Sequence, residues 1–389
     1  PRACRCPLAL PGAPRLGLVS RSLYALFFAS VTAGPVTRYR DLAPQLATLG
    51  RMAVTRLSLL RGASLLVVGL AKIAIVGRPL QDEINGILLA VEMGATPTMV
   101  EAWYVVIAGL LALYFLFSGY SDMALGIGAM IGLSLASNFD SPFKARTGVE
   151  FVERWHQSLM AWIRVYIFLP IAKGILSRCN ARKASLGFVA WASASLASFA
   201  FMGAWHGSGW PPLAAGLVAG LLLILFRLHV ASTIRLKTTA SDRHRMPLLL
   251  FVLIALVALP ILVQDWAVLL PILTGLVDLD SLNLGRILTD KLTMIFPQAH
   301  EFFAARSEAI MPLSTLGLHH AFGFLLGAVV IVTAFPNTLQ IFELPNVSGE
   351  TRIVWRPNIL WGVVLGALAL ASAMVSVEHV GTGFVYNAF

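Results

Sequence analysis

The sequence has little charge and very little cysteine. Charged residues make up 12% of its 389 positions, whereas soluble proteins carry about 25%. Hydrophobic residues make up 58%, and the mean hydropathy is +0.79. This composition excludes an ordinary soluble protein and predicts an integral membrane protein. Cys4, Cys6 and Cys179 show neither paired metal-ligand spacing nor an even disulfide set, so we assign them no role and expect no metal site.

A long hydrophilic domain and a recognisable internal repeat are also missing. We therefore predict one integral-membrane domain over residues 21–389, and the missing repeat argues against a transporter built from inverted halves. Residues 1–20 form an irregular segment without the continuous apolar core of a signal peptide. Because the sequence starts at Pro1 rather than Met, we expect a truncated or miscalled start, with transmembrane segments missing before Arg21.

Apolar runs predict a polytopic bundle of transmembrane helices. A helix needs about 20 apolar residues to cross a bilayer, and most of the clearest runs come close to that length. Shorter runs that contain glycine are further candidates. The clear runs are Ala102–Phe117, Leu186–Trp205, Leu213–Leu228, Pro247–Val263, Ala321–Phe335 and Ile359–Val377, and the shorter ones are Gly62–Val76 and Met123–Leu135.

The net charge of +10 has a membrane explanation. Arginine and lysine lie mostly between the apolar runs, which favours topology and anionic lipid over nucleic acid. The basic segments 178–183 and 227–245 enclose two spans, so both are predicted to be cytoplasmic. Phe151–Leu176 also starts beside basic residues and contains three more. For this segment we predict an in-plane or re-entrant helix packed against protein, and we leave the N-terminal third without a topology.

His156 is the first candidate functional residue, in the stretch Glu153–Leu159. An ionisable side chain at membrane depth usually faces a protein interior or a wet cavity, and histidine can move a proton near neutral pH. In a helix, His156 shares a face with Val152, Met160 and Ile163, so we expect it to be buried. The alternative is a structural histidine hydrogen-bonded to a carbonyl.

His206 is the second candidate and has a different setting. It ends an apolar run, among glycines and between Trp205 and Trp210. Glycines permit non-helical backbone and close approach, and tryptophans supply an apolar wall with a polar handle. This pattern favours a site, with an interfacial aromatic belt as the alternative.

A third polar group is Asp122, which follows Ser118 between two apolar runs. We favour a buried polar network that fixes helix packing, and we keep both residues as candidates for supporting a site. Lys72 is a lone cation in a short apolar run, so it is predicted to be paired or to extend its ammonium group toward water.

Taken together and in this order, several stretches resemble the membrane-bound O-acyltransferase family, specifically its bacterial branch that acylates cell-surface polymers. The resemblance runs from about Leu23 to Phe389. The matching stretches are Thr32–Tyr39, Phe117–Asp122, Asn138–Phe139 with Pro142–Phe143, Arg154–His156 with Ser158–Leu159, Trp205–Gly207, Phe335–Thr338 and Phe384–Tyr386. The family often has an acidic residue after the arginine at the position of Arg164, where this sequence has Val165.

The resemblance implies a fold of transmembrane and re-entrant helices around a central tunnel. It also implies that His206 is the catalytic histidine and that His156 is a second conserved histidine nearer the cytoplasmic entrance. Arg154 and Gln157 would help His156 to orient the donor or to stabilise an oxyanion. Flanking tryptophans, Trp155 and Trp205, are further candidates for supporting the site.

The implied reaction is acyl transfer, most simply acetyl transfer to a polysaccharide such as alginate, at the bacterial inner membrane. A base must take the hydroxyl proton, and a neutral histidine suits this task. The resemblance implies no tightly bound cofactor and an acyl thioester, acetyl-CoA or an acyl carrier, as co-substrate. Expected partners are membrane lipid, an extracytoplasmic SGNH-type acyltransferase and an acyl carrier protein, with no nucleic acid.

Two alternatives stay open. D-alanyl transfer to teichoic acid would take its donor from a carrier protein. A proton-coupled transporter or flippase would use the histidines as a relay and would work without a thioester.

Overall fold

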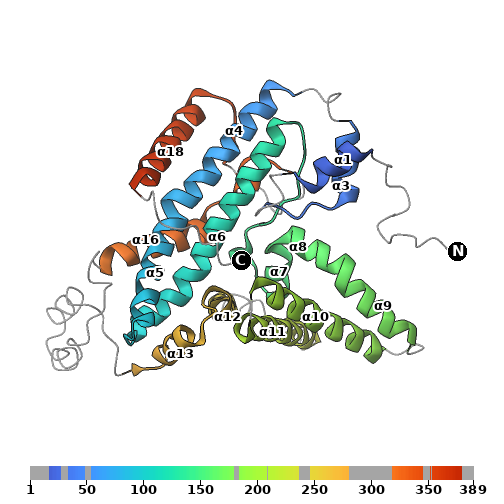
Figure 1. The fold of residues 1–389 in the computed structure, drawn as a ribbon, viewed down its shortest axis with the longest axis vertical. Coiled ribbons are helices and arrows are strands. Elements are labelled where there is room, and N and C mark those ends of the chain that lie inside the picture. The colour runs from blue at the N-terminus through green and yellow to red at the C-terminus, as the bar shows by residue number, and fades with distance from the viewer. Residues whose placement is uncertain are drawn as a thin grey trace.

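The chain is predominantly helical in the part that the computed structural model describes, which is residues 17–27, 34–48, 54–178, 184–207, 209–235, 246–279, 318–344, 351 and 353–378. No strand occurs among these residues (Figure 1). The helices are α1 (Leu18–Ala25), α3 (Tyr39–Ala47), α4 (Arg56–Ala71), η1 (Lys72–Gly77), α5 (Arg78–Glu92), α6 (Met99–Met130), η2 (Pro142–Lys144), α7 (Gly148–Arg154), α8 (Gln157–Ile163), η3 (Arg164–Phe168), α9 (Leu169–Arg178), α10 (Ala184–His206), α11 (Trp210–Arg235), α12 (Met246–Leu262), α13 (Trp266–Gly275), α16 (Leu318–Ala334), α17 (Thr338–Ile341) and α18 (Ile359–Glu378).

Six helical stretches are long and apolar enough to cross a membrane, which agrees with the predicted multi-pass bundle. Three shorter apolar helices accompany them within the described residues, in α12, α13 and α16. The six stretches are Arg56–Glu92, Met99–Met130, Gln157–Ser177, Leu186–His206, Trp210–His229 and Ile359–Ser376.

The helix α6 corrects one prediction, because it joins two runs that we had separated. Ala102–Phe117 and the greater part of Met123–Leu135 belong to this one helix of 32 residues. Asp122 suggested a break between them, but it lies inside the helix, where it forms an ion pair with Lys72. A charge with a buried partner does not have to end a membrane helix.

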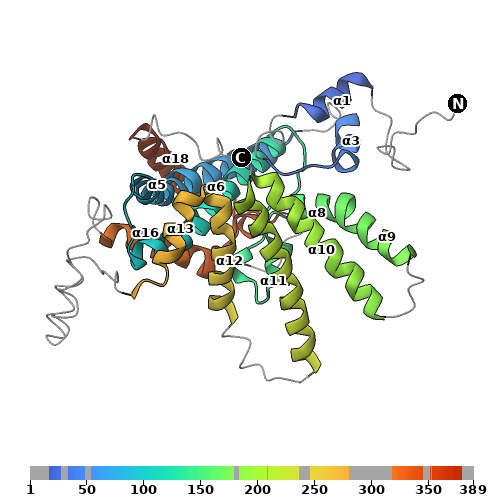
Figure 2. The ribbon, with the colours of Figure 1, turned by 60° about the horizontal axis from the view of Figure 1, so that its bottom comes forward.

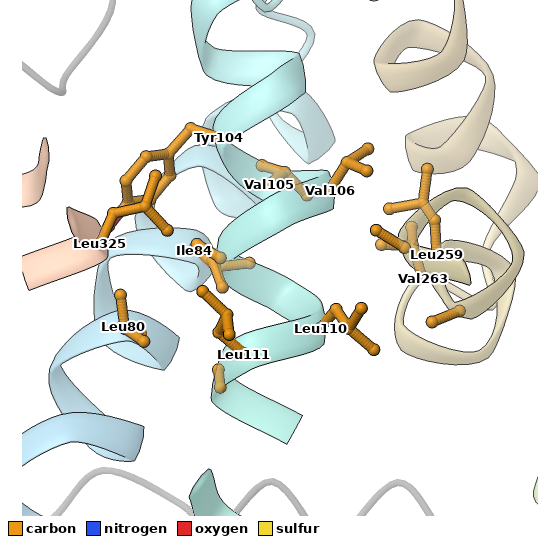
Figure 3. Close-up of a cluster of buried hydrophobic side chains, with 14 of the residues drawn as sticks. Leu80, Ile84, Tyr104, Val105, Val106, Leu110, Leu111, Leu259, Val263 and Leu325 are labelled. Atoms are coloured by element: carbon orange, nitrogen blue, oxygen red, sulfur yellow. The ribbon is translucent and has the colours of Figure 1, made fainter. Parts of the chain in front are cut away.

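The same helix forms the centre of the main hydrophobic core. Its N-terminal half presents Tyr104, Val105 and Leu111, which are almost fully buried. In Figure 3 side chains of α5, α16 and the end of α12 approach this half of α6 from different sides, among them Leu80 and Leu325. A helix buried on most of its surface needs to be apolar all round, which agrees with the composition of α6. The helices α5, α12 and α16 pack around it.

Glycines allow α4 and α6 to pack backbone to backbone. Gly62 and Gly69 of α4 face Gly126 and Gly119 of α6, so the two helices run antiparallel side by side (Figure 1). A Cβ atom on Gly62 would lie 2.5 Å from the carbonyl oxygen of Gly126. Small residues at such contacts let membrane helices approach closely.

The antiparallel pairing also gives the N-terminal third a topology. Arg56 and Arg61 lie at the start of α4. Because the start of α4 and the end of α6 lie together, both arginines lie at one end of this helix pair. The positive-inside rule predicts that this end is cytoplasmic.

The segment 148–178 differs from the single helix that we predicted there. The α7 helix ends at Arg154, and α8 starts at Gln157 after a break at Trp155 and His156. From Gln157 the helix continues through η3 and α9 and packs against α10 (Figure 2). Its length and composition also fit a membrane crossing, so a re-entrant path stays a prediction. Predictions for residues 1–16, 179–183, 236–245 and 384–386 lie outside the described residues.

A glycine substitution in α10 should test the packing of this half of the molecule. A Cβ atom on Gly203 would meet the carbonyl oxygen of Pro212 and would lie 3.0 Å from the Cα atom of Gly216. We expect Gly203→Ala to lower the stability of the purified protein by about 1–3 kcal/mol, as overpacking does, measured as a lower melting temperature in detergent. Gly187→Ala in the same helix is the matched control, because nothing lies within 4 Å of its Cβ position. Equal stability of the two variants would contradict the close α10–α11 contact.

Candidate active site

A cavity of about 320 Å³ lies where α6 faces α10, α11 and α12. The helix α7, the start of α8 and the stretch around Val36 complete its wall, and most of the side chains that line it are apolar. Along α11 the lining runs from Ala215 to Phe226, which corresponds to about 16 Å at the rise of an α-helix. The cavity is therefore elongated and lies inside the bundle, where the family resemblance implied a central tunnel.

Both candidate histidines line this cavity. His206 is the last residue of α10, and His156 lies at the break between α7 and α8. They approach the cavity from different elements, as the sequence predicted. The structure brings them together, and their chemical roles remain predictions.

His206 is oriented by the turn of α10 that precedes it. Its Nδ1 atom lies 2.7 Å from the carbonyl oxygen of Met202, so Nδ1 of the neutral ring carries the proton and donates it to this acceptor. The basic lone pair of the ring is then on Nε2. The ring also packs edge to face against Trp205, with 4.9 Å between the ring centroids.

The backbone of His206 is held from a second helix. Gln264, just after α12, donates from Nε2 to the carbonyl oxygen of His206 over 3.2 Å. A Cβ atom on Gly207 would collide with the Gln264 side chain, so only glycine leaves room for this contact. The end of α10 is thus fixed at the cavity by a hydrogen bond that satisfies one of its terminal carbonyls.

His156 is buried, with 7% of its surface exposed, as we predicted. Its backbone has φ 45° and ψ 50°, a left-handed conformation that histidine adopts more readily than most residues. The ring lies edge to face against Phe117, with centroids 4.6 Å apart. Its Nδ1 atom is 3.2 Å from Oδ1 of Asn138. The side chain is therefore held by an amide rather than by the backbone carbonyl of the alternative interpretation.

The two tryptophans of the prediction also reach the cavity. Trp155 lines it and stacks on Phe151, with 5.4 Å between the ring centroids. Trp205 lies at its edge, with 59% of its surface exposed. Trp155 also packs against Phe139 in an aromatic cluster, which makes this part of the wall rigid. Trp205 can contact a ligand that enters the cavity.

Arg154 and Gln157 do not line the cavity. The Arg154 guanidinium pairs with Glu150 over 2.7 Å. The Gln157 side chain accepts a hydrogen bond from Ser137 and donates one to the carbonyl oxygen of Glu153. The Arg154 ion pair lies within α7, whereas the hydrogen bond from Gln157 to Glu153 bridges the α7–α8 break.

Asp122 and Ser118 lie away from the cavity, in the contact between α6 and η1. Nζ of Lys72 is 2.6 Å from Oδ2 of Asp122, and both groups are largely buried. This confirms the predicted polar network between helices and the predicted pairing of Lys72. Ser118 and Asp122 line a void of about 10 Å³ next to Asn138, which is too small for a substrate.

Two residues that position the histidines were not predicted from the sequence. Asn138 was noted only as part of a motif, although a buried amide directly after a span is itself a signal. Gln264 was not noted, although it is a polar residue at the end of the apolar run that becomes α12. Among the described residues, no group of three or more His, Cys, Asp or Glu side chains could hold a metal ion.

Comparison with known proteins gives this geometry a context. Residues 15–261 match the family described as MBOAT, membrane-bound O-acyltransferase family. The chain is 26% identical over 212 residues to a peptidoglycan O-acetyltransferase of Helicobacter pylori, covering 54% of this chain and 38% of the relative. It is 32% identical over 202 residues to a probable alginate O-acetylase of Azotobacter vinelandii, covering 49% of this chain and 38% of the relative.

A third relative is named for a different activity. The chain is 31% identical over 134 residues to a teichoic acid D-alanyltransferase of Streptococcus thermophilus, covering 34% of this chain and 31% of the relative. In all three comparisons the match covers well under half of the relative's length.

Proposed function

Because the chain belongs to the membrane-bound O-acyltransferase family, we propose that it transfers an acyl group from a thioester donor to hydroxyl groups of a cell-surface polysaccharide, or across the membrane toward them. The observation that carries the proposal is that His206 and His156 line one apolar cavity inside the bundle. Acetyl is the proposed group, since two of the relatives described above are named O-acetylating proteins.

The proposed reaction uses His206 as the general base. The hydroxyl oxygen of the acceptor attacks the thioester carbonyl carbon while Nε2 of His206 takes the hydroxyl proton. The new C–O bond forms, the C–S bond breaks, and the proton passes to the departing sulfur, which leaves as a thiol. An apolar cavity suits this chemistry because water that would hydrolyse the thioester is kept out.

The site would work with other components of the cell envelope. The proposed location is the bacterial inner membrane, with the basic end of α4 and α6 in the cytoplasm. A cytoplasmic donor, acetyl-CoA or an acyl carrier protein, would reach the cavity from that side. An extracytoplasmic SGNH-type acyltransferase is the proposed acceptor-side partner if the acyl group is passed across the membrane.

D-alanyl transfer to teichoic acid is the second candidate, and the relative from Streptococcus thermophilus favours it. A deletion strain, complemented with the wild-type gene, separates the two. Mass spectrometry of the surface polymers should show the loss of O-acetyl esters and their return on complementation. Loss of D-alanyl esters would support the second candidate, and unchanged esters of both kinds would contradict the proposed function.

A further inference from the structure

The residue that connects most of the polar groups around His156 is Asn138. It is almost fully buried, with 1% of its surface exposed, and it lies in the loop between α6 and η2. Its backbone carbonyl accepts the N–H of Gln157 over 2.8 Å. Its side-chain amide contacts His156, Ser158 and Ser121. One side chain thus holds the helix break that carries His156 and also contacts α6.

The structure orients this amide with Oδ1 toward Ser158 and His156 and with Nδ2 toward Ser121. Ser158 Oγ accepts the backbone N–H of Val36 over 2.8 Å and donates its own proton to Oδ1 of Asn138 over 2.5 Å. Nδ2 of Asn138 donates to Oγ of Ser121 over 2.8 Å. The amide therefore presents an oxygen, which can only accept, to the His156 ring.

An acceptor at 3.2 Å from Nδ1 of His156 selects one tautomer of the ring. Nδ1 must carry the proton, so the neutral ring has its lone pair on Nε2. Among the described residues the His156 ring makes no other hydrogen bond, and the residue lines the cavity. What His156 offers to a ligand there is consequently an acceptor.

We propose that Asn138 is a positioning residue that holds His156 as the Nδ1–H tautomer, so that Nε2 accepts a hydrogen bond from a hydroxyl or thiol group in the cavity. This inference rests on the proposed acyl transfer for its functional meaning. It assigns His156 to binding the group that bears the proton, and it leaves the developing oxyanion to other donors, because a bare Nε2 cannot donate to it.

The test reads the tautomer directly and needs no substrate. The full chain, labelled with ¹⁵N at histidine and placed in lipid nanodiscs, is compared with His156→Asn to identify the His156 signals. The signals that are lost in the variant belong to His156. Asparagine is the replacement because it tolerates the left-handed backbone at this position. The wild-type protein should show a protonated Nδ1 and an unprotonated Nε2 for His156. A protonated Nε2 in the wild-type protein overturns the proposal.

Two Asn138 variants then connect the tautomer to function. Asn138→Asp keeps an acceptor and should keep the Nδ1–H form. Asn138→Leu removes the acceptor, so we expect protonation to shift toward Nε2 and kcat to fall by about 10- to 100-fold, as for other residues that orient a histidine, with KM changed less. An unchanged tautomer in a folded Asn138→Leu protein contradicts the proposal. If that variant does not fold, the wild-type and Asn138→Asp spectra decide, because loss of the Nδ1–H form in Asn138→Asp also contradicts it.

These outcomes separate the inference from the proposed function. A wild-type protein with the expected tautomer but no acyl-transfer activity would refute the proposed function and leave the role of Asn138 intact. An active acyltransferase with the other tautomer would refute the role of Asn138 and leave the proposed function intact.

Discussion

Replacing His206 with alanine is expected to abolish polymer acylation while the protein still inserts into the membrane. Removal of a general base lowers the rate by about 10²–10⁴-fold, so at most traces of polymer ester are expected. Insertion should persist because the apolar residues of α10 are unchanged, although the side-chain contacts of His206 with the carbonyl oxygen of Met202 and with the Trp205 ring are lost. Mass spectrometry of the polymer esters and membrane fractionation measure the two results.

The matched control for this variant is another membrane-helix histidine. His229 lies on α11, is exposed, and does not line the cavity. His229→Ala should therefore leave acylation close to the wild-type level. Retained acylation in His206→Ala at equal protein abundance would refute the catalytic assignment.

Breaking the ion pair between Lys72 and Asp122 is expected to have the largest effect on stability. Asp122→Leu would leave the Lys72 ammonium buried without its partner, and loss of one partner of a buried pair costs about 3–5 kcal/mol. The pair joins η1 to the C-terminal half of α6, so the cost falls on the packing between these two elements. Thermal unfolding of the purified protein in detergent should show a much lower midpoint and a lower yield of monodisperse protein.

A second substitution distinguishes an unpaired charge from lost packing. The double variant Lys72→Met with Asp122→Leu contains no charge at this contact, and it should recover most of the stability. If the double variant is as unstable as Asp122→Leu alone, the destabilisation comes from side-chain shape rather than from the unpaired ammonium.

The sequence predicted the class of fold and the histidines because both depend on simple physics. Long apolar runs require helices in a bilayer, and an ionisable residue within them requires a protein-lined environment. These arguments placed His156 and His206 inside the bundle, and the structure puts both at the same cavity. The pairing of Lys72 followed from the same reasoning, although its partner could not be chosen from the sequence.

The parts that the sequence did not predict depend on contacts between distant segments. Asp122 suggested a helix boundary, because the neutralising Lys72 lies 50 positions earlier and on another helix. The break at His156 is stabilised by Asn138, 18 positions away, so helical periodicity alone extended α7 into α8. Gln264 contacts His206 across 58 positions. In each case the deciding partner is distant in the sequence, and a window of neighbouring residues does not contain it.

The apolar lining of the cavity has a consequence for the energetics of the membrane. A cavity that reaches into a bilayer is a potential leak, and a charge that enters an apolar passage pays a large solvation penalty. Under the proposed function, the apolar walls from Ala215 to Phe226 would accept an uncharged acyl group and resist protons and ions. Acyl transfer through the bundle would then leave the electrochemical gradient across the membrane intact.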